Sequence, residues 1–489
     1  MANWTRREFL RDGVLLPAAA AVLADVPVYG TERTVAARKV GANDRIHVAV
    51  IGFHGQGRAH LSGFARLADC EVTAICDVDS SLADMGMKIV EDAQKKRPKY
   101  YQDLRKLLED KDVDVVTIAT PNHWHALAAI WAIQAGKDVY VEKPVSHNVW
   151  EGRRIVDFAR KYQKIVQTGT QSRSNEGMRE LIDYILSGKI GTVYLARGLC
   201  YKRRPSIGPR TETPVPPGVD YNLWLGPAPE KPITRRRFHY DWHWFWDYGN
   251  GDLGNQGIHE MDKARWGLGQ HALCRAVLSI GGRFGYEDAG ETANTQVCWY
   301  DYGTQQLIFE VRGLPTDHPK DAPAAFHVKK QNWVGNIWYG TEGIAVSNSY
   351  AAGAVFTPQG ELVRKFSGGG NHYQNFIKAV RSRRHTDLNA DIEEGHLSSA
   401  LCHLGNISYR LGKAQDPQAP VEGSTREMQE TVQEMLRHLQ DNGARVQGLF
   451  RVGPRLTFDP TRERFPNYEE ANRLLTRDYR KPFVVPERA

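Results

Sequence analysis

Short apolar runs and amphipathic segments alternate regularly between residues 46 and 170. Runs rich in β-branched residues predict buried strands at 46–51, 72–76, 113–119, 137–141 and 165–169. The segments between them carry apolar residues at helical spacing. Strands that alternate with helices in this way predict an α/β fold with a doubly wound parallel sheet and right-handed crossovers. Ligands of such a sheet bind at the carboxyl ends of its strands, so the residues there are the first candidates for a site.

A glycine-rich turn follows the first predicted strand, and Asp77 ends the second. This order of strand, turn, helix, strand and an acid about 20 residues later is typical of a Rossmann dinucleotide-binding unit. The glycines let the backbone approach a pyrophosphate, and the acid binds ribose hydroxyls. His54 occupies the position of the middle glycine in G-x-G-x-x-G. Gly55, next to it, is expected to take the steric role of that glycine. Asp77 favours NAD because a carboxylate repels a 2′-phosphate, whereas Arg58 leaves NADP open.

The pattern changes after residue 170. Short strands at 193–199, 276–281, 292–300 and 306–312, with others near 335–357, predict a large, mostly antiparallel sheet. A long insertion, 201–266, rich in proline and tryptophan, interrupts it, and helices are expected at 373–381, 393–411 and 427–441. We therefore expect four parts: a signal and linker at 1–43, a Rossmann domain at 44–170, an α/β substrate and oligomerisation domain at 171–415, and a helix with an irregular tail at 416–489.

The N-terminus predicts export. Arg6 and Arg7 precede a mild, alanine-rich apolar segment from Gly13 to Leu23, the arrangement of a twin-arginine signal. That route carries folded proteins, so a periplasmic or secreted protein with a preloaded cofactor is expected, with the export machinery as a partner. The apolar segment is too short for a stable membrane anchor. The alternative is a disordered basic N-terminus.

Composition excludes some classes of function. A charged fraction of 25% with 41% hydrophobic residues is that of a soluble globular chain. The net charge of +7 comes from scattered Lys and Arg without a long basic block, so nucleic acid is not expected as a partner. The six cysteines have no C-x-x-C spacing, and several fall in predicted strands. They are expected to be buried free thiols, and no metal site is predicted.

Residues at the strand ends and in the glycine turn are expected to bind the dinucleotide: Gly52, His54, Gly55, Gln56, Gly57, Asp77, Thr120, Asn122, His125, Glu142 and Gln171. Two further residues are suited to chemistry. Lys143 can hydrogen-bond a substrate hydroxyl and stabilise alkoxide character, unless it is a surface lysine at a turn. His259, on a predicted helix from 258 to 266, can act as general base, unless it is a buried histidine bonded to a backbone carbonyl. Asn255 lies four residues before it and can share its helix face.

Four segments in this order resemble the Gfo/Idh/MocA family, named for glucose–fructose oxidoreductase and inositol dehydrogenase. They are the opening glycine-rich unit, 119–125 (ATPNHWH), 142–144 (EKP) and 251–259 (GDLGNQGIH), and the resemblance spans roughly 46–411. It implies a Rossmann domain, a second domain whose open sheet often forms homo-oligomers, and a catalytic set of Lys143 and His259. The family's acid is replaced by Asn255, which cannot take up a proton, so Asp252 and Asp262 are candidates to compensate. Secreted members with twin-arginine signals look most similar.

The insertion carries candidate substrate-binding residues. Tyr240, Trp242 and Trp244 can stack on sugar rings, and Asp252 can bond sugar hydroxyls, although core or interface filling is an equal alternative for the aromatic residues. The basic runs 202–204 and 235–237 can reach a phosphate or an acidic sugar, with a solvated surface as the alternative.

Together these features predict an exported NAD(P)-dependent oxidoreductase that acts on a secondary hydroxyl of a sugar or polyol. One alternative is redox-assisted glycoside cleavage with a retained, recycled NAD, which suits a compartment where free NAD is scarce. A second alternative is a sugar-binding protein without activity.

Overall fold

A six-stranded parallel sheet forms the first domain of the computed structural model, which describes residues 44–316 and 332–489. The predicted export segment lies outside these residues. The strand order is β3-β2-β1-β4-β5-β6, the doubly wound order, with the topological switch point between β1 and β4. The strands are β1 (Ile46–Ile51), β2 (Cys70–Cys76), β3 (Lys99–Tyr101), β4 (Val115–Ile118), β5 (Asp138–Val141) and β6 (Val166–Thr168). The helices are α2 (Gly57–Ala65), α3 (Ala83–Gln94), α4 (Leu104–Leu108), α5 (Asn122–Gln134) and α6 (Val149–Lys161).

The strand β3 was not predicted. The sequence pattern predicts a helix from Tyr101 to Leu108, but Tyr101 ends β3, and α4 begins only at Leu104. Asp103 sets this boundary, because its side chain accepts a hydrogen bond from the N–H of Arg105 and caps the helix. β3 pairs in parallel with β2 and completes the edge of the sheet.

The second domain is built on an eleven-stranded mixed sheet in the order β14-β13-β12-β11-β7-β10-β9-β8-β16-β15, with β17 also paired to β8. Only β7 and β10 run parallel among the described pairs, so the sheet is mostly antiparallel, as predicted. The strands are β7 (Val193–Lys202), β8 (Ala276–Gly282), β9 (Thr295–Asp301), β10 (Gln306–Arg312), β11 (Asn332–Gly340), β12 (Ile344–Ser347), β13 (Ala352–Phe356), β14 (Leu362–Ser367), β15 (Lys413–Ala414), β16 (Arg451–Val452) and β17 (Leu456–Thr457).

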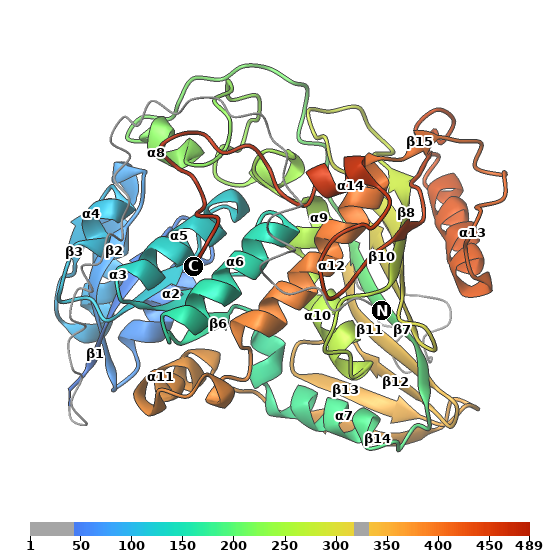
Figure 1. The fold of residues 1–489 in the computed structure, drawn as a ribbon, viewed down its shortest axis with the longest axis horizontal. Helices are drawn as coiled ribbons and strands as arrows, with labels where there is room; N and C mark the ends of the chain where they lie inside the picture. Colours follow the sequence, from blue (N-terminus) through green and yellow to red (C-terminus); the bar gives the residue numbers. More distant parts are fainter. Residues whose placement is uncertain (1–43, 317–331) are drawn as a thin grey trace, which may run out of the picture.

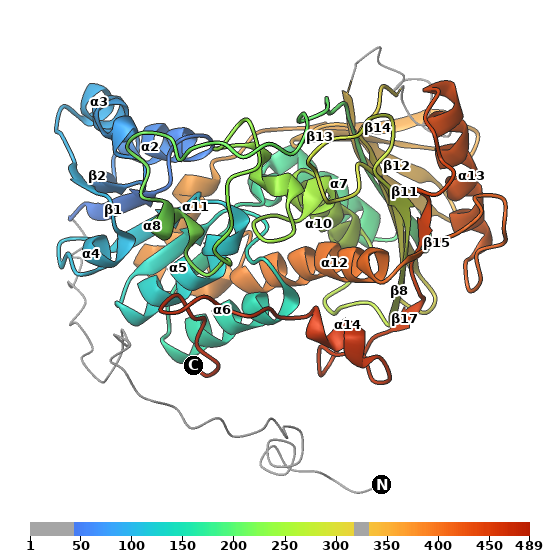
Figure 2. The ribbon, with the colours of Figure 1, turned by 90° about the horizontal axis from the view of Figure 1, so that it is seen from above.

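The helix α12 (Ile392–Arg410) joins the two domains. It packs against α6 and β6 of the first domain and against β8 of the large sheet, and both views show it lying between the domains (Figures 1 and 2). Sixteen of its nineteen residues are buried, as a helix covered on both sides requires. The remaining helices are α7 (Glu176–Leu186), α8 (Tyr221–Leu225), α9 (Gly251–Asn255), α10 (Ile258–Gly267), α11 (His372–Ser382), α13 (Arg426–Asp441) and α14 (Glu469–Arg473).

The C-terminal tail is part of the fold. Its strands β16 and β17 extend the large sheet beside β8, and α13 covers one face of that sheet through Met428, Val432 and Met435. Further along, Phe483 packs against two tryptophans of α5. The tail therefore touches both domains. All six cysteines are buried and none forms a disulfide, as their spacing predicts. No helix among the described residues is long and apolar enough to cross a bilayer.

Candidate active site

The glycine turn after β1 brings two backbone segments into close contact at the switch point of the first sheet. Gly52 has φ +78°, and a Cβ on it would lie 2.9 Å from the backbone nitrogen of Thr120. A Cβ on Gly57, the first residue of α2, would lie 1.9 Å from the carbonyl oxygen of Gly52. A Cβ on Gly55 would meet nothing within 4 Å. Gly52 and Gly57 therefore allow the backbone to pack, and Gly55 leaves open space in front of the turn.

A cavity of about 1260 Å³, counted with its open mouth, begins at this turn. Most of the residues predicted to bind the dinucleotide line it: Gly52, His54, Gly55, Gln56, Asp77, Thr120, Asn122, His125 and Glu142. Lys143 and Asn255 line the same space, so one cavity connects the glycine turn with the predicted reactive end. Gly57 lies beneath the turn, and neither Gln171 nor His259 contributes to the wall.

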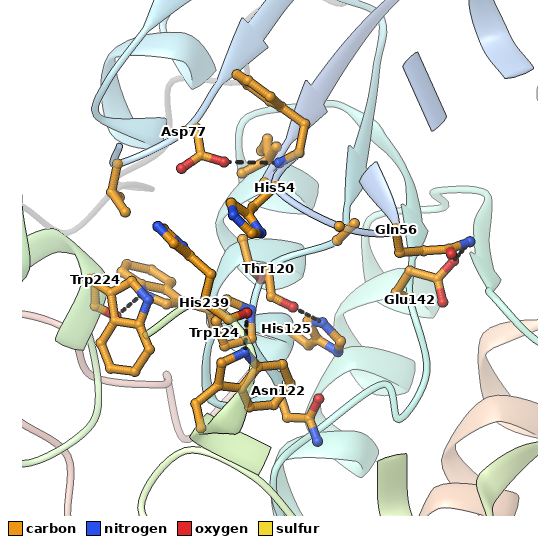
Figure 3. A pocket seen from close by; sticks show the side chains of 18 of the residues that line it. His54, Gln56, Asp77, Thr120, Asn122, Trp124, His125, Glu142, Trp224 and His239 are labelled. Carbon is orange, nitrogen blue, oxygen red and sulfur yellow. Dashed lines mark hydrogen bonds between the residues drawn. The ribbon is translucent and has the colours of Figure 1, made fainter. Parts of the chain in front are cut away.

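Asp77 is fixed at the end of β2 by two backbone donors. The N–H of Phe53 donates to its Oδ2 (2.9 Å; Figure 3), and the N–H of Asp79 donates to its Oδ1 (3.0 Å). Burial raises the pKa of Asp77 to about 6, although these two hydrogen bonds oppose the shift. Each carboxylate oxygen keeps a lone pair for a further donor, such as a ribose hydroxyl.

Glu142 is tied to the helix that follows the glycine turn. Its Oε1 lies 3.0 Å from Nε2 of His60 and accepts from the amide of Gln56 (3.4 Å). The other ring nitrogen of His60 lies 3.2 Å from the hydroxyl of Thr117. Burial opposes ionisation of Glu142, but the hydrogen bond and charge of His60 lower its pKa to about 2. Glu142 is therefore an anion whose position is set by α2.

His125 holds together the two loops that carry Thr120 and Lys143. Its Nδ1 lies 2.6 Å from the carbonyl oxygen of Pro144, and its Nε2 lies 2.8 Å from that of Thr120. Burial lowers the pKa of this histidine. By bridging the ends of β4 and β5, His125 fixes the backbone on either side of the predicted reactive lysine.

Lys143 reaches across to the second domain. Its Nζ donates to the backbone carbonyl of Asn255, at the end of α9 (3.0 Å). Burial lowers the pKa of Lys143, while the charge of Glu142 works against this shift. Asn122 strengthens the same junction by donating to Asn250, just before α9 (3.0 Å).

His259 lies behind Asn255, at the second residue of α10. The two are not on one continuous helix, because α9 ends at Asn255 and α10 begins at Ile258. His259 is buried beside the ring of Tyr350 (centroids 4.9 Å apart), and its Nδ1 has no hydrogen-bond partner among the described residues. Burial, followed by the charge of Lys143, lowers the pKa of His259 well below its ordinary value. It is therefore a neutral imidazole close to Lys143.

The two carboxylates expected to compensate for Asn255 are both bound to arginines. Asp252 accepts two hydrogen bonds from Arg204 (2.6 and 2.7 Å), and Asp262 is held by Arg173 (2.9 Å). Neither is placed to relay a proton to His259. Glu260, which is not among the predicted site residues, is fully buried next to His259 and 4.0 Å from Nζ of Lys263. Burial raises the pKa of Glu260.

The outer wall of the cavity comes from the long insertion. Residues 218–242 lie across the carboxyl ends of the first sheet, and we call this segment the strap (Figures 1 and 2). It is joined to the first domain by hydrogen bonds from Ser80 N to Gly218 O and from Asp220 N to Val78 O (both 2.9 Å). The indole of Trp124 donates to the carbonyl of Leu223 (2.9 Å). The insertion therefore covers the nucleotide-binding domain as well as the substrate side.

His54, the residue that departs from the usual glycine pattern, contacts the strap. Its ring stacks on that of His239, with centroids 4.1 Å apart and planes 11° apart (Figure 3). His239 is also anchored by its Nε2, which lies 3.0 Å from Oδ2 of Asp79. Burial lowers the pKa of both histidines. A glycine at position 54 would remove this contact between the glycine turn and the strap.

The strap and its C-terminal continuation contain the candidate substrate residues in different environments. Tyr240 and Trp242 line the cavity, and Tyr240 is 43% exposed. Trp244 is buried among the apolar residues of the insertion, with the guanidinium of Arg283 4.7 Å from its ring. Asp252 is occupied by Arg204, as described above. The core-filling alternative therefore describes Trp244, whereas Tyr240 and Trp242 can contact a ligand.

Several wall residues are not among those predicted from the sequence. They are Phe53, Val78, Trp124, Leu223, Trp224 and His239. Trp124 lies within the ATPNHWH segment, so its motif gave a signal. The strap residues lie in a stretch without periodicity, and only the pairing of the insertion with the first domain reveals them.

The residues present fit a dinucleotide. The turn leaves open space at Gly55 directly before the N-terminus of α2, where a pyrophosphate binds to N–H groups. Asp77 offers a buried carboxylate to a ribose, and the cavity runs from there to Lys143. Glu142, Thr120 and Asn122 lie between these ends.

Comparisons with known proteins agree with this geometry. Residues 46–170 match the model described as "Oxidoreductase family, NAD-binding Rossmann fold", and residues 203–320 match "Oxidoreductase family, C-terminal alpha/beta domain", both of the Gfo/Idh/MocA family. The inositol 2-dehydrogenase/D-chiro-inositol 3-dehydrogenase of Lacticaseibacillus casei is 25% identical over 277 residues, which cover 53% of this chain and 74% of that one.

A glycosyl hydrolase family 109 protein of Shewanella pealeana is 32% identical over 172 residues, 32% of this chain. The matched region spans only 38% of that relative's length. A solved structure of levoglucosan dehydrogenase in complex with NADH has the same fold, with a TM-score of 0.57 at 18% identity, covering 74% of this chain and 97% of that one. The two domain models match in the predicted order, the first over the whole parallel sheet and the second over strands β8 to β10 of the large sheet, and they assign this chain to the Gfo/Idh/MocA oxidoreductase family with its NAD-binding domain.

Proposed function

We propose that this protein is an NAD-dependent oxidoreductase that moves a hydride between nicotinamide and a secondary hydroxyl of a carbohydrate or polyol. The observation that carries the proposal is that Lys143 and Asn255 line the same cavity as the glycine turn and Asp77. The inositol dehydrogenase relative supports a polyol or sugar as the substrate class.

The nicotinamide of a bound NAD would supply the hydride acceptor or donor, and Lys143 and Asn255 line the cavity that would hold it. Lys143 Nζ donates one hydrogen bond to the carbonyl of Asn255, and its other N–H groups can donate to the reacting oxygen. Because burial lowers its pKa, this lysine can share a proton with that oxygen more readily than a solvated lysine. His259 is neutral and close to Lys143 but does not line the cavity, so we assign it the role of taking up the hydroxyl proton by way of Lys143. Asn255 can orient the substrate but cannot accept a proton.

The experiment is to identify the dinucleotide that co-purifies, by mass spectrometry, and then to screen sugars and polyols for absorbance change at 340 nm. We expect bound NAD and a sugar-dependent change. A purified protein that holds no dinucleotide and shows no fluorescence response to added NADH would rule out the proposal.

A second candidate function is redox-assisted glycoside cleavage with a retained NAD. The strap that encloses the cavity favours it, and so does the 32% identity to a glycosyl hydrolase family 109 protein over the matched region. Release of an aryl aglycone without net change in NADH absorbance distinguishes this function from a plain dehydrogenase. No release from a panel of aryl glycosides, together with net NADH formation, supports the dehydrogenase instead.

We also propose export by the twin-arginine route and assembly into homo-oligomers. The paired arginines Arg6 and Arg7 support export, and the exposed Leu362 and Val363 on the edge strand β14 support self-association. Replacing both arginines by lysine should leave the protein in the cytoplasm, as fractionation would show. Light scattering should give a mass above the 55.1 kDa of one chain.

A further inference from the structure

A second, shallower hollow of about 480 Å³ opens beside the main cavity. It is lined by Arg203, Arg204, Pro205, Arg237, Tyr240 and Trp244. Tyr240 lines both spaces, so the two adjoin. The hollow also lies next to α9, because Arg204 bonds Asp252 on that helix, whose last residue is Asn255 beside Lys143. It is therefore close to the reactive end of the cavity.

The floor of the hollow is a fixed guanidinium. Arg204 donates from Nε and Nη2 to the two oxygens of Asp252 (2.7 and 2.6 Å) and from Nη1 to the hydroxyl of Tyr240 (2.8 Å). Asp252 is only 1% exposed. Its charge therefore lies behind the arginine, away from solvent, and holds the guanidinium in one orientation.

Arg237 lies on the wall of the hollow and forms an ion pair with a second buried carboxylate. Its Nη2 lies 2.6 Å from Oδ1 of Asp241, which is buried, while the arginine side chain is 56% exposed. The guanidinium also lies over the ring of Tyr240, 5.0 Å from its centroid. The guanidinium is thus held between Asp241 and Tyr240, and the side chain lines the hollow. An arginine held in this way loses little conformational freedom when it binds a ligand.

The sequence neighbours of Arg237 have contacts outside the hollow. Arg235 is buried against the rings of Trp224 and Phe238, and Arg236 is exposed and lies along Gly208. Neither lines the hollow. The three arginines 235–237 therefore lie in three different environments. Among them, only Arg237 lines the hollow together with Arg203 and Arg204.

Three guanidinium groups and two carboxylates make the hollow positive, and both carboxylates are buried behind the arginines. Forked N–H donors of this kind bind carboxylate, sulfate and phosphate groups. We propose that this hollow is a subsite for an anionic substituent, and that the substrate is an acidic carbohydrate whose reacting hydroxyl extends to Lys143. The substrate class rests on the proposed function, whereas anion binding by the hollow does not.

Calorimetric titration of the NADH-loaded protein tests the subsite. The acidic ligands are glucuronate, galacturonate, glucose 6-sulfate and glucose 6-phosphate, each compared with its neutral parent sugar, and their order distinguishes a carboxylate from a sulfate or phosphate ester. We expect at least one acidic ligand to bind about tenfold or more tightly than its parent. Arg237→Gln should weaken that ligand about 10- to 100-fold without changing the neutral sugar.

Arg236→Gln is the matched control, because it removes the same charge one residue away and leaves the hollow intact. The proposal is overturned if no acidic ligand binds more tightly than its parent, or if Arg236→Gln weakens binding as much as Arg237→Gln. Absorbance at 340 nm is recorded on parallel samples that are loaded with NAD in place of NADH. Tight binding of an acidic ligand without any reduction of NAD would contradict the oxidoreductase proposal but would still support the anion subsite.

Discussion

Substituting two glycines of the same turn should separate folding from cofactor binding. Gly57→Ala places a methyl 1.9 Å from the carbonyl oxygen of Gly52, and the atom it meets is backbone. Gly55→Ala places a methyl in open space, and the backbone of Gly55 is not in the left-handed region. The two variants add the same atom at positions two residues apart, so any difference between them comes from the local geometry.

The magnitudes follow from what each methyl meets. Overpacking typically costs about 1–3 kcal/mol, and a backbone clash belongs at the upper end, so Gly57→Ala should destabilise by about 3 kcal/mol. That corresponds to a fall in melting temperature of about 6–12 °C. Gly55→Ala should change stability by no more than about 1 kcal/mol, because the unfolded chain loses some freedom and the folded chain has room.

Gly55→Ala should weaken cofactor binding, although it hardly changes the stability of the protein. The open space at its Cβ is where a pyrophosphate approaches the turn, so the same overpacking of about 1–3 kcal/mol arises when the dinucleotide binds. The dissociation constant for NADH should therefore rise roughly 5- to 150-fold in Gly55→Ala.

The assay is differential scanning fluorimetry of dinucleotide-free protein, followed by NADH titration monitored by fluorescence. Wild-type protein stripped of dinucleotide in the same way is the reference. If Gly55→Ala melts as early as Gly57→Ala, or binds NADH as tightly as wild type, Gly55 does not take the place of the missing middle glycine.

Three further predictions concern the ends and the cover of the cavity. Lys143→Met should lower turnover by about 10²- to 10⁴-fold while the bound dinucleotide measured by mass spectrometry is unchanged; retained turnover would remove the role of the lysine. Asp77 has a pKa of about 6, and the ribose hydroxyls would donate to its ionised form. NADH affinity should therefore increase with pH up to about pH 6, by at most about tenfold per unit, and level off above it. Asp77→Asn should flatten this dependence. His239→Ala removes the stack on His54 and the bond to Asp79, and stopped-flow release of NADH should become about tenfold faster; an unchanged release rate would show that the strap does not hold the cofactor.

The first domain follows from the sequence because its signals are local. Each strand is a short apolar run, each helix has its own periodicity, and the carboxyl ends of parallel strands meet at one edge. The sequence of the first domain alone therefore predicts that Thr120, Glu142 and Lys143 lie in one cavity with Gly52. β3 is the exception, because it is three residues long and carries too few positions to show a period.

The second half of the site depends on contacts distant in sequence. Nothing near Asp252 indicates that Arg204, 48 residues earlier, neutralises it, and nothing near Asp262 indicates Arg173. A carboxylate three or seven residues from a histidine, as Asp262 and Asp252 are from His259, looks like a proton relay in sequence. Whether it is one depends on which cation the fold brings to it.

The tail is a similar case. Its irregular pattern predicts an appendage, yet the guanidinium of Arg480 donates to the side chain and carbonyl of Asn222 (both 2.7 Å) and to the carbonyl of Gly226 (3.0 Å). These residues belong to α8 and its C-terminus within the strap. A segment without secondary structure thus fixes the cover of the cofactor cavity, through backbone and polar groups that leave no periodic pattern.

These contacts bear on which reaction the site performs. A dehydrogenase that exchanges its dinucleotide at every turnover needs a cover that opens easily. Here opening requires breaking the bonds of Gly218 and Asp220 to the first domain, the anchor of His239 on Asp79, and the bonds of Arg480 to α8. At about 0.5–1.5 kcal/mol for each neutral hydrogen bond and more for the charged ones, these contacts stabilise the closed strap and slow the exchange of dinucleotide. A cofactor that exchanges slowly supports faster turnover when it is restored to its starting state within the site. The strap therefore favours a substrate that is oxidised and reduced again in one visit, or a second substrate that returns the hydride, over net release of NADH.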